Sequence, residues 1–382
     1  MNLWIEPSTE GDAYVTCHAT LEDPQGRRFP YFIKIPQQWE HAVKDPGDAF
    51  LVLALFQAMR YGGKLHVKGC VSPSLIENLE EFQTAWSLWR PGLYKALEIE
   101  ADEMKESTAP VKEAVLMPFS GGLDSCFSVL IHRERDRQHS NPPCRVAMMV
   151  HGFDISIDDS EGFARALVHS RAILDDVGMK CIDVATNVRE HHGDWEDTHG
   201  AALAACIHLL GKTFGSGVIA SSHTYDTLRF PWGSNPLTDP MLSSQASRIL
   251  SDGYKNKRST KAEKVAQWPA AIEHLRVCWI NKDTSENCGH CLTCVGTALC
   301  FAASGAPVPH RLGIESPELA VSRLGRISLS EAGCLRLADT ILATAGECGV
   351  HEPWVAAIDR LLKKKKRAAD FRQALKTPAF GF

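Results

Sequence analysis

The hexapeptide SGGLDS, residues 120–125, has the residue types and order of a phosphate-binding turn. An apolar run precedes it and a second apolar run with helix-compatible spacing follows it. Gly121 and Gly122 have no Cβ, so their amides can approach a ligand closely. Short polar groups beside the positive end of the helix dipole come from Ser120, Asp124 and Ser125. The pattern therefore predicts a strand, a phosphate turn and a helix start; the alternative is a Gly-Gly turn with a polar helix cap.

Two other phosphate motifs are excluded. No GxxxxGK[ST] pattern is present, and no GxGxxG follows the apolar run. The sequence thus gives no support for a γ-phosphate loop of the Walker type or for a dinucleotide-binding turn.

Four cysteines with metal-ligand spacing lie in CWINKDTSENCGHCLTC, at Cys278, Cys288, Cys291 and Cys294. Two-residue gaps let a tight turn direct successive sulfurs inward, and a first cysteine from across a loop completes a tetrahedral zinc site. The competing interpretation is a redox CxxC pair. Within the zinc interpretation, His290 and Cys300 are the substitute ligands if one cysteine assignment fails. A zinc ion with four protein ligands would fix a loop and could not activate water.

The hexapeptide resembles the PP-loop of the ATP pyrophosphatases, which split ATP between its α and β phosphates. Together with the later CGxCxxC cluster, it looks like 7-cyano-7-deazaguanine synthase and its relatives, over residues 112–300. The resemblance implies that ATP, with Mg²⁺, is bound by residues 120–125 (Leu123 included) and by His151, and that Zn²⁺ is held by the cysteines. It also implies catalytic roles for Asp124 and Ser125.

Two further segments match the motifs of this family less closely. Thr260–Glu263 is similar to the family's TKxE segment, which makes Lys261 the cationic residue that helps to hold phosphate; the alternative is an exposed lysine on a helix. The substrate loop of the synthase corresponds to SSHTYDTLRFPWGSNPLTDP, but its Gly-Tyr-Pro-Asp-Cys-Arg-like motif is missing. The candidate substrate residues there are Ser222, His223, Asp226 and Arg229.

The implied reaction is adenylation of a carboxylate, of the 7-deazaguanine type or a related small molecule, with release of pyrophosphate. Ammonia or an amine, a protein amine included, would then capture the activated carbon. One competing class is a tRNA-modifying PP-loop enzyme, for which Cys126 and Cys144 leave thiol chemistry open. A third class is a nonenzymatic zinc-stabilised module that binds a nucleotide or a partner protein.

Composition narrows these classes. A chain of 382 residues with 44% hydrophobic content can form two domains with proper cores. The formal net charge of −5 argues against binding nucleic acid by bulk electrostatics. No leader-like segment or membrane span is evident, and thirteen cysteines without such a leader indicate reduced thiols. We expect a soluble, cytoplasmic protein.

From residue 115 onward, apolar strand-like runs alternate with helical segments: 115–119, 123–135, 145–151, 160–177, 181–184, 197–210 and 217–221. Such alternation predicts a doubly wound parallel sheet of the adenine nucleotide α-hydrolase-like class, with ligands bound beyond the carboxyl ends of the strands. His151 ends one of the strand-like runs, and Asp154, Asn187 and Ser222 each follow one. His151 is equally well explained as a strand-end histidine bound to the backbone.

The sequence divides the chain into three parts. Residues 1–108 read as an N-terminal α+β domain with helices at 48–60 and 72–89, before a linker at 105–112. Residues 112–300 form the PP-loop domain with the zinc loop 278–294, and 301–382 a helical C-terminal extension with helices at 316–324, 328–345 and 353–375. The lysine run at 363–367 reads as the solvated face of the last helix.

Two polar clusters have a weaker functional interpretation. A second metal could be held by the loop that carries His191, His192, Asp194, Glu196, Asp197 and His199, although exposed polar loops have this composition without ligands. Trp232 either stacks on a planar ring or anchors its Pro-rich loop to the core.

Overall fold

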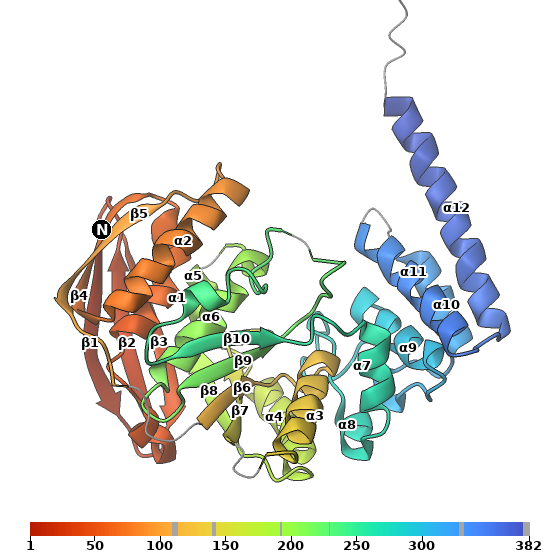
Figure 1. The fold of residues 1–382 in the computed structure, drawn as a ribbon, viewed down its shortest axis with the longest axis horizontal. Helices are drawn as coiled ribbons and strands as arrows, with labels where there is room; N and C mark the ends of the chain where they lie inside the picture. The colour runs from red at the N-terminus through yellow and green to blue at the C-terminus, as the bar shows by residue number, and fades with distance from the viewer. Residues whose placement is uncertain (109–113, 140–142, 192, 229, 328–331, 377–382) are drawn as a thin grey trace, which may run out of the picture. The chain divides into compact units, whose positions relative to one another are not determined.

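The computed structural model describes residues 1–108, 114–139, 143–191, 193–228, 230–327 and 332–376 (Figure 1). Their contacts divide the chain into two compact units. The first unit holds residues 1–120 and 124–255, and the second holds 121–123 together with the chain from 256 onward.

One sheet of ten strands forms the frame of the first unit, in the order β10-β9-β6-β7-β8-β3-β2-β1-β4-β5. Most neighbouring strands are parallel; β1 with β2, β2 with β3, and β3 with β8 are antiparallel. In chain order the strands are β1 (Asn2–Glu10), β2 (Tyr14–Glu22), β3 (Arg28–Pro36), β4 (Gly63–Val71), β5 (Leu97–Met104), β6 (Ala114–Pro118), β7 (Cys144–His151), β8 (Cys181–Thr186), β9 (Ser216–Ala220) and β10 (Arg248–Asp252).

The sheet is mixed, whereas the sequence predicted a parallel sheet and a separate N-terminal α+β domain. The N-terminal strands join the parallel strands through β3 and β8, where Ile33 lies opposite Thr186 and Lys34 opposite Ala185. Strands from both sides of the predicted 105–112 linker therefore belong to one sheet. The strands β1 and β10 were not predicted, because their sequences are rich in polar residues and show no clear alternation.

Helix α1 (Gly47–Met59) occupies the centre of this unit, and all of its residues are buried. It packs against α6 and against strands β1, β2 and β4. This helix confirms the one that the sequence predicted at 48–60. The other helical segments of the unit are η1 (Gln37–Ala42), α2 (Pro73–Trp89), α3 (Leu123–Asp136), α4 (Ser160–Asp175), α5 (Val188–His191), α6 (Trp195–Leu209) and η2 (Pro240–Leu242).

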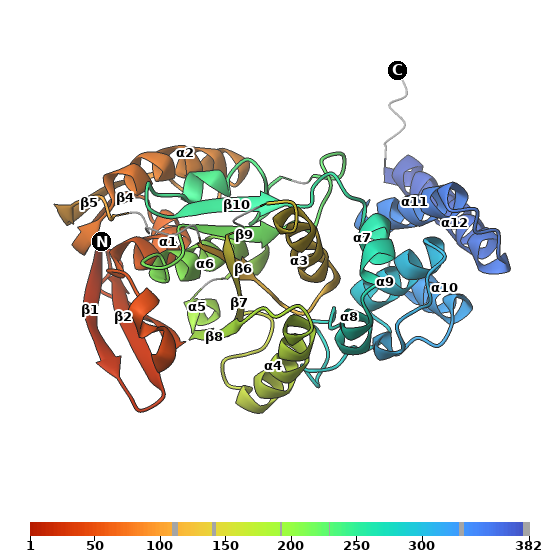
Figure 2. The same cartoon turned by 60° about the horizontal axis from the view of Figure 1, so that its bottom comes forward.

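Helices cover both faces of the sheet, and successive side chains of β7 show this directly. Met148 belongs to the large core that also contains α1 and α6. Met149, the next residue, packs with Phe163 and Leu167 of α4. Because successive side chains of a strand point to opposite faces, α6 and α4 lie on opposite sides of β7 (Figure 2).

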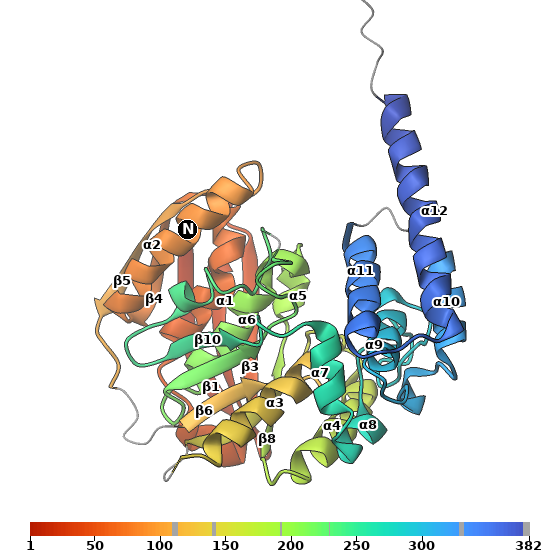
Figure 3. The same ribbon diagram turned by 45° about the vertical axis from the view of Figure 1, so that its right-hand side comes forward.

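The second unit is helical (Figure 3). Helix α9 is almost wholly buried, since it packs against α7, α10 and α11. The predicted helices after residue 300 are confirmed as α10, α11 and α12, except that residues 328–331 lie outside the described part. The elements of this unit are α7 (Arg258–Val265), α8 (Pro269–His274), α9 (Leu292–Ala303), η3 (His310–Leu312), α10 (Pro317–Arg326), α11 (Ala332–Glu347) and α12 (Pro353–Lys376).

In the ranges that the structure describes, no helix is both long enough and apolar enough to span a bilayer.

Candidate functional site

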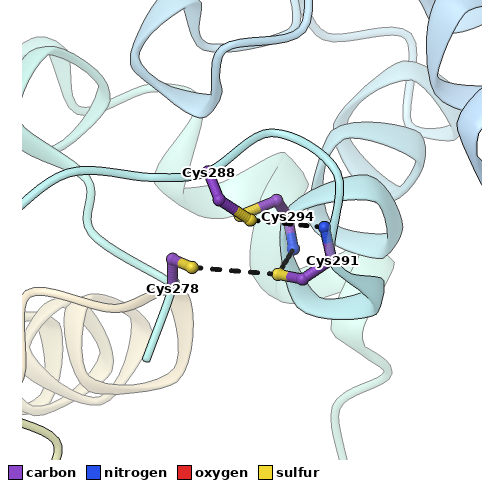
Figure 4. Close-up of side chains that lie close together, drawn as sticks. All are labelled: Cys278, Cys288, Cys291 and Cys294. Atoms are coloured by element: carbon purple, nitrogen blue, oxygen red, sulfur yellow. Dashed lines mark hydrogen bonds between the residues drawn. The ribbon is translucent and has the colours of Figure 1, made fainter. Parts of the chain in front are cut away.

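The four predicted cysteines come together in the second unit (Figure 4). Cys278 follows α8, Cys288 lies in the next loop, Cys291 caps the N-terminus of α9 and Cys294 lies in its first turn. Their sulfur atoms all lie within 4.8 Å of one another. The Sγ atoms of Cys278 and Cys291 are 3.9 Å apart, as are those of Cys288 and Cys294.

This geometry fits a tetrahedral zinc ion. Zinc–sulfur bonds of about 2.3 Å place the four sulfurs of a tetrahedron about 3.8 Å apart, close to the spacing of the two pairs above. All four donors are cysteine sulfurs, which is the ligand set of structural zinc sites. The cluster is thus a four-cysteine site that could hold a zinc ion, with no ligand position left for a catalytic water.

Backbone amides orient two of the sulfurs. The amide of Cys291 donates to Sγ of Cys288, and the amide of Cys294 donates to Sγ of Cys291, each over 3.3 Å. Such bonds favour the thiolate that a metal requires. Hydrogen bonding with the neighbouring thiols, Cys291 first, lowers the pKa of Cys278 well below its ordinary value, while the bond to Cys278 raises the pKa of Cys291.

Asn287 holds the cluster together, and the sequence-based prediction missed it. Its Oδ1 accepts the amides of Val277 (2.8 Å) and Cys278 (3.1 Å). Its Nδ2 donates to the carbonyls of Leu275 (2.8 Å) and Arg311 (2.9 Å). One amide side chain thereby ties the segment before Cys278 to the turn that carries the other three cysteines. The only available signal was a small polar residue directly before a CxxC turn.

Gly289 relieves the backbone within the turn. Its φ is +73°, and a Cβ there would lie 2.7 Å from the carbonyl oxygen of Gly313. Arg323 links Gly289 to Gly313, since its Nη1 donates hydrogen bonds to the carbonyls of both residues over 2.7 Å each. A residue other than glycine would be strained here, and its side chain would displace the guanidinium group of Arg323.

The predicted phosphate turn lies between β6 and α3, as the sequence indicated. Gly121 adopts a φ of +72°, a conformation that glycine reaches without a steric penalty. Its carbonyl accepts a hydrogen bond of 3.0 Å from the amide of Arg276. Along the turn Ser120 is exposed, Gly122 and Asp124 are half-buried, and Leu123 and Ser125 are buried.

The turn stands at the topological switch point of the parallel strands. From β6 the chain moves to β7 and then to β8 on one side, and it returns to β9 on the other side of β6. The crossover through α4 and the crossover through α6 lie on opposite faces, as Met149 and Met148 show. Residues 120–125 follow the carboxyl end of β6, where such a reversal opens a crevice in parallel α/β sheets.

The side chains of two other strand-end residues, His151 and Asn187, make hydrogen bonds to the backbone. His151 donates from Nε2 to the carbonyl of Ser156 over 2.7 Å and stacks on Phe163, with ring centroids 4.5 Å apart. Burial is the largest effect on this imidazole, and it lowers the pKa of His151. Asn187 accepts the amide of Phe32 and donates to the carbonyl of Pro30, so it extends the joint between β8 and β3.

The candidate substrate loop is placed only in part. Ser222 and Asp226 are exposed, and Asp154 after β7 is exposed as well. The ring of His223 meets Trp232 edge-on at 5.1 Å, and Trp232 meets His199 in the same way at 5.4 Å. Trp232 therefore contacts both its own loop and helix α6, which agrees with the anchoring interpretation. Arg229 lies outside the described residues.

Lys261 lies on α7 in the second unit and is only 2% exposed. The alternative of an exposed helical lysine is therefore wrong.

The second metal site finds no support in the described residues. The ring of His191 bonds the carbonyl of Pro30 over 2.7 Å, and Nδ1 of His199 bonds the carbonyl of Trp195 over 3.1 Å. Asp197 is fully buried and binds Arg90 (3.0 Å) and Tyr94 (3.2 Å). His192 lies outside the described part, and within that part the four cysteines are the group with metal-site geometry.

Models of protein families, curated proteins and solved structures were all compared with this chain, and none of them matches it.

Proposed function

We propose that this protein is an adenylating ligase of the ATP pyrophosphatase type. In this proposal the parallel part of the sheet is doubly wound in the manner of the adenine nucleotide α-hydrolases. The observation that carries the proposal is the position of SGGLDS: it follows β6 at the switch point of the sheet and opens helix α3. Backbone amides at a helix start and a nearby glycine turn are suited to phosphate.

Each residue of the turn has a proposed role. Gly121 and Gly122 bring backbone amides to the phosphates, and the hydroxyls of Ser120 and Ser125 donate hydrogen bonds to the departing pyrophosphate. The carboxylate of Asp124 would hold Mg²⁺, which neutralises phosphate charge when it is bound. Lys261, an ammonium with little contact to solvent, is the proposed additional cation.

The chemistry needs no protein nucleophile. When ATP is bound, its α phosphorus is the centre that a substrate carboxylate attacks; the oxygen–phosphorus bond forms as pyrophosphate leaves. An amine or ammonia then displaces AMP and forms an amide. The chain's contribution is to hold the pyrophosphate still and to align the acid. The proposed acid is a carboxylated 7-deazaguanine or a related small molecule, and the four-cysteine site stabilises the fold.

Product analysis tests this proposal. Purified protein is incubated with ATP, Mg²⁺, ammonium and a panel of carboxylated deazapurines, and pyrophosphate and orthophosphate are measured separately. We expect pyrophosphate and AMP to form together, dependent on the acid and not on RNA. Ser125→Ala should lower the rate at least about tenfold, while Thr84→Ala on the exposed surface of α2 should not change it. Orthophosphate and ADP as the products would overturn the proposal.

A further inference from the structure

A pocket of about 340 Å³ lies in the first unit, away from residues 120–125 along α3. Its walls include Met117, Val129 and Met179, which are apolar, and Arg133, Arg137 and Arg145. The arginines come from the last turn of α3, from the residue after it and from the start of β7. The pocket thus combines an apolar floor with a rim of guanidinium groups.

The rim carries an excess of positive charge. Arg145 is held by Asp136 through two hydrogen bonds, one of them 2.9 Å from Nη2, and both side chains are largely buried. Asp136 is the one carboxylate of the lining, so this pair is neutral. Neither Arg133 nor Arg137 has an ion-pair partner among the residues that the structure describes. Two positive charges therefore remain uncompensated around an apolar cavity.

We propose that this pocket binds a small organic anion of charge about −2 that carries a compact apolar group. The guanidinium groups of Arg133 and Arg137 bind the anionic end, because planar arginine forks suit carboxylate and phosphate oxygens. Met117, Val129 and Met179 receive the apolar part. Asp136 keeps Arg145 fixed and so shapes the wall.

The pocket is separate from the proposed nucleotide site. Arg133 lies ten positions beyond Leu123, which corresponds to about 15 Å along the axis of α3. A ligand in the pocket and a phosphate at residues 120–125 would therefore occupy opposite ends of one helix. The inference does not depend on the proposed function, since it concerns binding at the far end.

A structural explanation of the same arginines makes a different prediction. Cations in the last turn of a helix stabilise its dipole without any ligand. Arg135 belongs to the same turn, but it is exposed and does not line the pocket. Helix stabilisation should therefore involve Arg135 as much as Arg133, whereas ligand binding should distinguish between them.

Phenyl phosphate is a suitable probe, because it joins a dianion to a flat apolar ring. Isothermal titration calorimetry at low salt should show saturable binding to one site per chain. Inorganic phosphate and phenol each lack one half of the ligand, and we expect each to bind at least about tenfold more weakly. Binding should weaken as salt is added, because part of the attraction is electrostatic.

Variants decide between the two explanations. Arg133→Gln and Arg137→Gln should each weaken phenyl phosphate binding by about tenfold or more, and Arg135→Gln should leave it unchanged. Excess ATP should not displace the probe. The proposal is overturned if no saturable binding is seen, if all three variants lose binding equally, or if ATP displaces the probe. Thermal midpoints of the variants show whether they are folded, and Arg133 and Arg137 provide two independent tests.

Discussion

The backbone amide of Cys278 donates a hydrogen bond of 3.1 Å to Oδ1 of Asn287, and this bond links two parts of the four-cysteine site. The same side chain makes three further bonds to the backbone, so all of its donors and its acceptor are used. Asn287 therefore sets the distance between Cys278 and the turn that carries the other sulfurs.

We expect Asn287→Ala to lower the free energy of unfolding by about 2–4 kcal/mol, because several backbone groups lose their partner at once. Zinc content should fall as well, since Cys278 is no longer held in place. Chemical denaturation and metal analysis measure the two effects. Asn281→Ala is the matched control: its Nδ2 makes one bond, to the carbonyl of Glu286. Equal effects of the two substitutions would contradict the role assigned to Asn287.

Metal removal should destabilise the protein. Purified protein is expected to contain one zinc per chain, and strong chelators should lower its thermal midpoint because binding energy of a structural zinc is folding energy. Cys291→Ser should abolish the effect of chelators and reduce zinc content. The exposed Cys348 lies outside the cluster, so Cys348→Ser should behave like the unmodified protein. Full zinc content in Cys291→Ser would count against a four-cysteine site.

Gly121→Ala tests the phosphate turn. Gly121 and Gly26 both have a left-handed backbone, with φ of +72° and +77°. Alanine at either position should therefore lower the free energy of unfolding by about 1–2 kcal/mol. Gly26 lies in the turn between β2 and β3, and a Cβ there meets nothing within 4 Å. We expect only Gly121→Ala to weaken ATP binding, measured by calorimetry. If both variants bind ATP as the unmodified protein does, residues 120–125 do not hold the nucleotide.

Local patterns predicted the parts of the fold that depend on local physics. The spacing of Cys288, Cys291 and Cys294 was enough to place three sulfurs together, because a tight turn and a helix start position them. The strand before residue 120 and the helix after it were also predicted from local sequence patterns. Alternation of strands and helices from residue 115 predicted helices on both faces, and Met148 and Met149 confirm them.

The joint between β3 and β8 could not be predicted in this way. It depends on pairing between residues about 150 positions apart, such as Ile33 with Thr186, and no local pattern specifies such a partner. Asn187 was read as a site candidate because it follows a strand; its side chain instead bonds the backbone of β3. Polar residues at strand ends serve ligands and neighbouring strands alike, and only the tertiary contacts distinguish the two uses.

Asp239 should make the stability of the protein depend on pH near neutrality. Its carboxyl group is fully buried and accepts hydrogen bonds from Ser234 Oγ (2.8 Å) and the Asn235 amide (3.0 Å). Burial outweighs these bonds and raises the pKa of Asp239 to about 7. An unfolded aspartate has a pKa of about 3.9, so the folded state binds the proton more tightly. The contribution is fully present below that lower pKa and is lost as the pH rises through the folded pKa.

Between pH of about 5.5 and 8, this group alone should lower the free energy of unfolding by about 2 kcal/mol. Asp239→Asn cannot titrate, so the difference in unfolding free energy between the two pH values should shift by that amount relative to the unmodified protein. Urea denaturation at both pH values measures it, and Asp12→Asn, which removes an exposed carboxylate, controls for the change in net charge. Because other titrating groups are common to all three proteins, they cancel in the comparison. The same pH dependence in Asp239→Asn and the unmodified protein would mean that Asp239 stays ionised when buried, and that its hydrogen bonds outweigh desolvation.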